Sequence, residues 1–174
     1  MPGTSSIIRA TAKDAVLLAA IARDTFIESH GHSAPAADID AYINEKYSTA
    51  VFIEELNDPG NIYHILYHEG KAAGFSKIIF DLPYTGSTLQ NIAKLERIYL
   101  LKAFYGLQLG LQLLRFNMAL CQQHHQQGIW LYVWKENARA VHFYTRAGFS
   151  IIGSYDFKIS ATHANPNHQM LLEF

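Results

Sequence analysis

The stretch LERIYLLKAFYGLQLG, residues 95–110, joins a mostly apolar run to two glycines that stand four positions apart. The apolar residues 93–101 predict a β-strand. After the glycines, apolar side chains recur at helical spacing and predict an amphipathic helix. The side chains that would share one side of this helix are Leu109, Leu113, Phe116 and Leu120. The stretch therefore predicts a strand, a short loop and a helix in direct succession.

The loop YGLQLG, residues 105–110, has features of an anion-binding helix start. Backbone N–H groups at a helix N-terminus have no partner within the helix, and the helix dipole favours negative charge there. Gly106 permits a positive φ, and Gly110 permits tight packing of the helix on a sheet. We expect Gln108 to adopt right-handed helical geometry and to present only its N–H. Because the loop lacks the motifs of a nucleotide P-loop and of a dinucleotide fingerprint, an ordinary helix start remains an alternative.

The first sixty residues predict one strand and three helices. Residues 6–9 form the strand, and Thr11 with an acidic residue three positions later resembles a capping box that opens the first helix. The second helix is expected at residues 37–47. The third begins after Ser48 and ends at a DPG turn.

The remaining chain predicts a hairpin and a second strand–helix–strand segment. IYHILY at 62–67 and AAGFSKIIF at 72–80 flank the turn HEGK, and residues 82–89 form a loop. We expect Gly128 to cap the helix that follows residue 109. The last expected elements are a buried strand at 129–133, a helix from Asn137 to Gly148, and closing strands at 149–157 and 167–174. Together, the predicted strands and helices indicate an α/β fold.

The composition predicts a single domain spanning residues 1–174. Apolar residues make up 49% of the 174 residues and charged residues only 17%, so the core is large and the surface leaves room for a ligand or a homodimer contact. A net charge of −1 predicts no nucleic-acid or membrane partner. The single cysteine, Cys121, fits a reducing compartment, and no N-terminal apolar segment resembles a signal peptide. We therefore expect a cytoplasmic protein.

A second segment, WKENARAVHFYTRAGF at residues 134–149, places Asn137, Ala140 and Tyr144 on nearly the same face of a helix. Together with residues 95–110, this segment resembles the GNAT superfamily of acyl-coenzyme A N-acyltransferases. Both motifs stand in the family's order, and the whole chain from Ile7 can be read on the family's layout. The closest subfamily likeness is to bacterial enzymes that acetylate spermidine and related polyamines.

The resemblance implies a mixed, mostly antiparallel central sheet flanked by helices, with acetyl-coenzyme A as co-substrate. The main chain of Ile98, Tyr99 and Leu100 would run along the pantetheine arm, with one N–H directed at the thioester oxygen. Asn137 would also contact the coenzyme, or would only cap its helix, and the two roles are compatible. The loop would hold the pyrophosphate through the amides of Tyr105, Gly106, Leu107, Gln108, Leu109 and Gly110.

Two residues are candidates for proton transfer. Tyr144 would act as general acid toward the leaving thiolate, because a phenol with an ordinary pKa near 10 stays protonated at neutral pH. The alternative is a half-buried tyrosine whose hydroxyl is satisfied within the fold. Glu96 would take the proton of the amine through water, or would only be a partner of Lys94 or Arg97. The reaction also leaves open a mechanism without a dedicated base.

Charged and histidine residues elsewhere offer further hypotheses. Cations near the second motif would meet the 3′-phosphate of the coenzyme, or would simply be solvated: Lys135, Arg139 and Arg146. Acidic residues on the second helix would attract a cationic amine, or would form an ordinary charged face: Asp38, Asp40 and Glu45. His124 and His125 point about 100° apart on a helix, so we expect no metal site. His30 and His32 lie in the loop that borders the acceptor pocket in the resembled family.

The leading hypothesis is an acetyl-coenzyme A dependent N-acetyltransferase that acts on a small-molecule primary amine such as a polyamine. One alternative is an enzyme that acetylates protein N-termini or lysine side chains. A second is a module of the same fold that binds coenzyme A without turnover. Asn137 and Tyr144 favour an enzyme, because a binding module needs no acid beside the sulfur.

Overall fold

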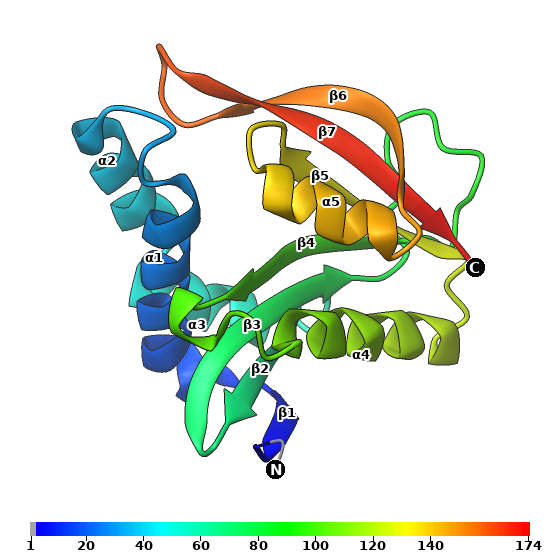
Figure 1. The fold of residues 1–174 in the computed structure, drawn as a ribbon, viewed down its shortest axis with the longest axis horizontal. Coiled ribbons are helices and arrows are strands. Elements are labelled where there is room, and N and C mark those ends of the chain that lie inside the picture. Colours follow the sequence, from blue (N-terminus) through cyan, green and yellow to red (C-terminus); the bar gives the residue numbers. More distant parts are fainter. Residues whose placement is uncertain (1–2) are drawn as a thin grey trace. The chain divides into compact units, whose positions relative to one another are not determined.

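The computed structural model describes residues 3–174 (Figure 1). In these residues seven strands form a sheet of order β1-β2-β3-β4-β5-β7-β6, flanked by helices. Strands β4 and β5 pair in parallel, whereas β1 with β2, β2 with β3, β5 with β7 and β7 with β6 pair antiparallel. The predicted mixed, mostly antiparallel α/β fold is confirmed. Within the described residues, no helix is both long and apolar enough to cross a membrane.

The chain divides into two compact units. The N-terminal unit contains the chain up to Ile78 together with Arg97–Asn117, and the C-terminal unit contains Ile79–Glu96 and Met118–Phe174. Strand β4 (Ala93–Leu100) and helix α4 (Leu109–Gln123) contribute residues to both. A single domain over residues 1–174 stays a prediction.

The N-terminal unit begins as the capping signals predict. The Asp14 carboxylate accepts the Thr11 N–H at 2.8 Å, and Ser48 Oγ accepts the Val51 N–H at 3.3 Å. Each bond satisfies or fixes a helix start. The resulting elements are β1 (Ser5–Arg9), the short helix η1 (Ala12–Asp14), α1 (Ala15–His30), α2 (Ala36–Lys46) and α3 (Thr49–Asn57).

The predicted hairpin consists of β2 (Ile62–His68) and β3 (Lys71–Ile79). Its two turn residues, Glu69 and Gly70, have φ angles of 49° and 75°. Positive φ at both central residues matches the turn that the twist of a two-residue hairpin favours.

An apolar core joins this hairpin to the start of α4. It consists of Leu66 from β2, Ala73 from β3, and Leu109 and Leu113 from α4, all buried. Ile98 and Leu100 of β4 pack against it. The core therefore fixes the beginning of α4 and the second half of β4 relative to the hairpin.

The predicted C-cap at Gly128 is wrong. Helix α4 ends at Gln123, and His125, with a φ of 58°, supplies the left-handed residue beyond it. Gly128 instead opens strand β5 (Gly128–Trp134). A side chain at Gly128 would collide with the backbone carbonyl of Leu172 on the neighbouring strand, so close strand packing accounts for the glycine.

The C-terminal unit holds helix α5 (Ala138–Arg146) and the closing strands β6 (Ser150–Lys158) and β7 (Ala164–Glu173). Gly148 follows α5 with a φ of 106°, a conformation that only glycine adopts readily. The chain then turns at once into β6, as the AGF sequence predicts.

Candidate active site

Strand β4 leads to the first part of the site. The N–H of Leu101, directly after the strand, donates to the carbonyl of Ala73 at 2.9 Å. A Cβ at Gly74 would overlap with the Tyr99 carbonyl oxygen, so the glycine allows β3 to lie close against β4. The predicted coenzyme-binding residues Ile98, Tyr99 and Leu100 thus lie on a strand that is closely held by its neighbour.

The loop after β4 alternates the sign of φ. A short helix, η2 (Lys102–Phe104), precedes it, and Tyr105, Gly106, Leu107 and Gln108 are exposed. Gly106 has a φ of 83° and Gln108 a φ of 58°, whereas Leu107 between them has no positive φ. Successive backbone N–H groups in a turn can face one concavity, which suits an anion. The Gln108 carbonyl then accepts the Gln112 N–H at 3.1 Å, and Leu109 and Gly110 begin α4.

The predicted right-handed geometry of Gln108 is wrong. Its φ of 58° lies in the left-handed region, which costs a residue with a Cβ about 1–2 kcal/mol. The left-handed turn at Gln108 directly precedes the first residue of α4. A glycine would adopt this φ at lower cost because it has no Cβ.

Helix α5 carries the second part of the site. The Asn137 side chain caps the helix, since its Oδ1 accepts the Ala140 N–H at 3.2 Å. One turn further, Tyr144 is 8% exposed and lies edge-on to Phe143 and Phe149, with ring centroids 5.3 and 5.6 Å away. This burial raises the pKa of Tyr144 well above the ordinary value for a phenol. The hydroxyl is therefore protonated at any physiological pH.

Glu96 on β4 is exposed. Lys94 and Arg97, the two predicted partners of Glu96, each contact other side chains as well. Lys94 Nζ lies 5.1 Å from the ring centroid of Trp130 and 5.4 Å from that of Tyr132. Arg97 Nη1 lies 3.7 Å from the carboxylate of Glu55.

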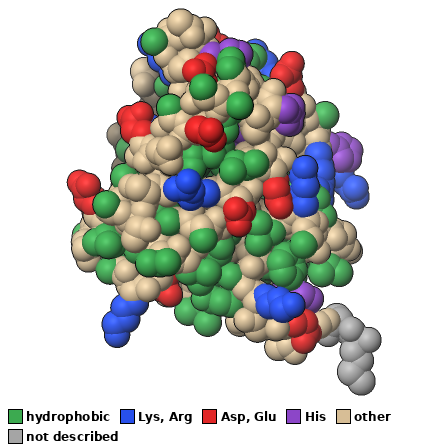
Figure 2. All heavy atoms as spheres, turned by 90° about the vertical axis from the view of Figure 1, so that its left-hand side faces the viewer, with side chains coloured by type: hydrophobic (Ala, Val, Ile, Leu, Met, Phe, Trp, Pro, Cys, Tyr) green, Lys and Arg blue, Asp and Glu red, His purple; other side chains and the backbone are tan. Residues whose placement is uncertain are grey.

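The predicted charged residues on helices lie at the surface. Lys135, Arg139 and Arg146 are exposed around α5. On α2, Asp38 is half-buried, Asp40 and Glu45 are exposed, and Glu45 forms an ion pair with Lys46 at 3.5 Å. Figure 2 shows carboxylates and cations interspersed with apolar side chains on one face of the molecule.

The structure brings His30 next to β4. Its ring stacks on Phe26 and lies edge-on to Tyr99 at 6.2 Å, and Nδ1 lies 2.7 Å from Ser29 Oγ. Burial and the nearby charge of His32 lower the pKa of His30 to about 4, so the imidazole is neutral at pH 7.

His124 and His125 lie at the end of α4. In residues 3–174, no three His, Cys, Asp or Glu side chains are grouped as metal ligands.

The predicted residues form two sets. Ile98 to Leu100 and the loop 105–110 belong to the N-terminal unit, where the apolar core of β2, β3 and α4 holds them. Glu96, Asn137 and Tyr144 belong to the C-terminal unit. Sequence reasoning missed a buried polar cluster, because its members are far apart in the chain: Glu55, Tyr63, Lys77 and Arg97.

Comparisons with known proteins identify the family and the fold. A model of the acetyltransferase (GNAT) family matches residues 19–149. An uncharacterized N-acetyltransferase of Lactobacillus delbrueckii subsp. lactis is 28% identical over 151 residues, which is 87% of each chain. An uncharacterized N-acetyltransferase of Mycobacterium tuberculosis is 29% identical over 152 residues, covering 87% of this chain and 93% of the relative. The PaiA N-acetyltransferase of Thermoplasma acidophilum, solved with coenzyme A, has the same fold, with a TM-score of 0.79 over 98% of this chain and 99% of that one at 18% identity.

Proposed function

Because the chain belongs to the acetyltransferase (GNAT) family, we propose that it transfers the acetyl group of acetyl-coenzyme A to a primary amine of a small molecule. The alternation of φ at Gly106 and Gln108, directly before α4, is the observation that carries this proposal. It supports a pyrophosphate site made of backbone N–H groups from residues 105–110.

In this proposal the amine nitrogen attacks the thioester carbonyl, and the C–S bond breaks to release the thiolate. A backbone N–H among residues 98–100 stabilises the oxyanion that forms in between. Preorganised donors of this kind contribute about 3–4 kcal/mol each. The proton of the amine passes to Glu96 through water or directly to solvent.

Tyr144 serves the leaving group. A thiol has an ordinary pKa near 8.5, and burial holds the pKa of Tyr144 far above that value. Full proton transfer from the phenol therefore costs free energy, whereas a hydrogen bond from the hydroxyl stabilises the thiolate without that cost. We accordingly assign Tyr144 mainly the role of a hydrogen-bond donor to the thiolate, and only secondarily that of a proton donor.

The proposed acceptor is a small cationic amine, with polyamines as the first candidates. Asp40 and Glu45, exposed on α2, favour a positively charged ligand. We place the reaction in the cytoplasm, in keeping with the single cysteine.

The test is release of free thiol from acetyl-coenzyme A in the presence of a panel of amines, with Tyr144→Phe as the matched variant. Thiol release with spermidine or another small amine, at least about tenfold faster than in the variant, supports the proposal. Turnover only with peptides would assign a protein acetyltransferase. Tight binding of coenzyme A in calorimetry with no turnover for any amine would assign a binding module.

A further inference from the structure

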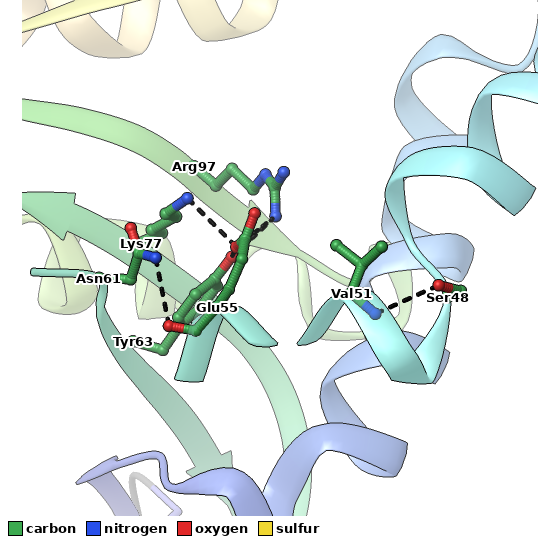
Figure 3. Close-up of polar contacts among 7 residues, drawn as sticks. All are labelled: Ser48, Val51, Glu55, Asn61, Tyr63, Lys77 and Arg97. Atoms are coloured by element: carbon green, nitrogen blue, oxygen red, sulfur yellow. Dashed lines mark hydrogen bonds and ion pairs between the residues drawn. The ribbon is translucent and has the colours of Figure 1, made fainter. Parts of the chain in front are cut away.

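A cluster of charged and phenolic side chains links four elements of the N-terminal unit (Figure 3). Glu55 Oε2, at the end of α3, lies 3.1 Å from Lys77 Nζ on β3 and 3.7 Å from Arg97 Nη1 on β4. It also accepts a hydrogen bond from the hydroxyl of Tyr63 on β2. One carboxylate oxygen thus connects a helix to three neighbouring strands.

Arg97 contacts both polar and aromatic side chains. Its Nη1 donates to the Tyr63 hydroxyl at 2.8 Å, and its guanidinium lies 4.9 Å from the ring centroid of Tyr47 and 5.9 Å from that of Phe52. Only 13% of the side chain is exposed. A planar guanidinium that both stacks on rings and donates hydrogen bonds has few accessible rotamers. The side chain therefore also restrains the main chain of β4 at Arg97.

Folding stability alone does not account for this cluster. Removing charges from water is costly, and apolar side chains of similar volume often replace buried ion pairs with no loss of stability. Lys77 is 4% exposed, so that cost applies here. Directional ionic hydrogen bonds provide a defined geometry, which apolar packing provides less strictly.

These ionic hydrogen bonds fix the position of β4 directly before the candidate site. Successive strand residues point to opposite faces, and Ile98 and Leu100 pack against the core formed with α4. Arg97, on the other face, is held by the cluster. This half of β4 is therefore clamped from both sides.

We propose that Arg97 is a positioning residue for acetyl transfer, held in place by Glu55, Tyr63 and Lys77. This inference rests on the proposed function, in which the main chain of residues 98–100 meets the thioester. A donor must stay within roughly 0.5 Å of its productive position to stabilise an oxyanion. Losing the clamp would displace this donor and leave the pyrophosphate loop intact, so we expect a much larger effect on kcat than on coenzyme affinity.

The test compares Arg97→Met and Tyr63→Phe with a control, Lys13→Met, which removes an exposed cation from η1. The measurements are kcat, KM for acetyl-coenzyme A, melting temperature, and amide hydrogen exchange of residues 98–101. We expect Arg97→Met to lower kcat by roughly ten- to a hundredfold with KM within about twofold, and to accelerate exchange on β4. We expect Tyr63→Phe, which keeps the ring in place, to lower kcat and to accelerate exchange on β4 by smaller amounts. The control changes none of these quantities.

Unchanged kcat and unchanged exchange in both variants would overturn the inference, and so would a rise in KM alone. Should Arg97→Met fail to fold, Tyr63→Phe decides. Faster exchange on β4 in a protein that turns over no amine would support the clamp while refuting the proposed function, so the two failures are distinguishable.

Discussion

Replacing Gln108 by glycine tests the geometry of the loop directly. In the left-handed region, a residue with a Cβ loses about 1–2 kcal/mol relative to glycine, and the φ of Gln108 is 58°. Replacing Gln108 by glycine removes this cost from the folded state. The same change makes the unfolded chain more flexible, which lowers the free energy of unfolding by about 0.4–1 kcal/mol. The net expectation, from the midpoints of these two ranges, is a stabilisation of about 0.8 kcal/mol, which corresponds to about 2–3 °C in melting temperature for a chain of this size.

The matched control is Leu107→Gly, one residue earlier in the same exposed loop. Leu107 has no positive φ, so glycine brings only the cost of a more flexible unfolded chain, about 0.4–1 kcal/mol. Urea unfolding of both variants and the parent protein measures the difference. We expect Gln108→Gly to bind coenzyme A within about threefold of the parent, because the N–H is retained at this position.

Equal destabilisation by the two glycine variants would refute this reasoning, since it would mean that Gln108 carries no backbone strain. If Gln108→Gly bound coenzyme A more than about tenfold more tightly than the parent, the expectation of nearly unchanged affinity would be refuted. Such a gain would show that the glutamine side chain obstructs the anion site that its backbone helps to form.

Three further predictions concern other parts of the chain. Tyr144→Phe should lower thiol release by at least about tenfold, with unchanged melting temperature and coenzyme affinity by calorimetry. Gly74→Ala should push β4 away through the Tyr99 carbonyl, costing about 1–3 kcal/mol of stability and lowering kcat. Burial, with the charge of Arg9, lowers the pKa of His64 from 6.5 to about 4. Its contribution to stability is therefore complete above pH 6.5 and is lost as the pH falls toward 4, by up to roughly 3 kcal/mol. Urea unfolding at pH 7 and pH 4.5 should show a smaller difference for His64→Phe than for the parent.

Features that depend on neighbours in the chain could be predicted from the sequence. Ser48 and Asn137 cap helices because each hydroxyl or amide oxygen needs only an N–H three residues ahead. The hairpin turn at Glu69 and Gly70 is equally local. The same holds for residues 105–110, which run from the short helix η2 after β4 into the first turn of α4. The family and the fold class followed from these local patterns, and both are confirmed.

Features that depend on distant backbone could not be predicted. Gly128 looks like a helix cap because it follows a helical pattern, yet the reason for the glycine is the Leu172 carbonyl, which only the pairing of β5 with β7 brings close. The close approach of Gly74 to Tyr99 is of the same kind. No local pattern distinguishes a glycine needed for close packing from one needed for its φ.

Under the proposed role of the Glu55, Tyr63, Lys77 and Arg97 cluster, a sequence motif predicts a coenzyme site more readily than it predicts a rate. Binding a pyrophosphate needs consecutive backbone N–H groups, so the residues responsible are adjacent in sequence. Holding a donor amide at the thioester needs side chains from several elements, and here Glu55 meets Lys77 and Arg97 across 22 and 42 positions of sequence (77 − 55 and 97 − 55). Mutations in Glu55 and Arg97 should therefore change the rate of transfer while the loop motif, and with it the affinity for the coenzyme, stays intact. Coupling between Arg97 and Glu55 in a double-mutant cycle on kcat would follow from this argument, and additive effects would contradict it.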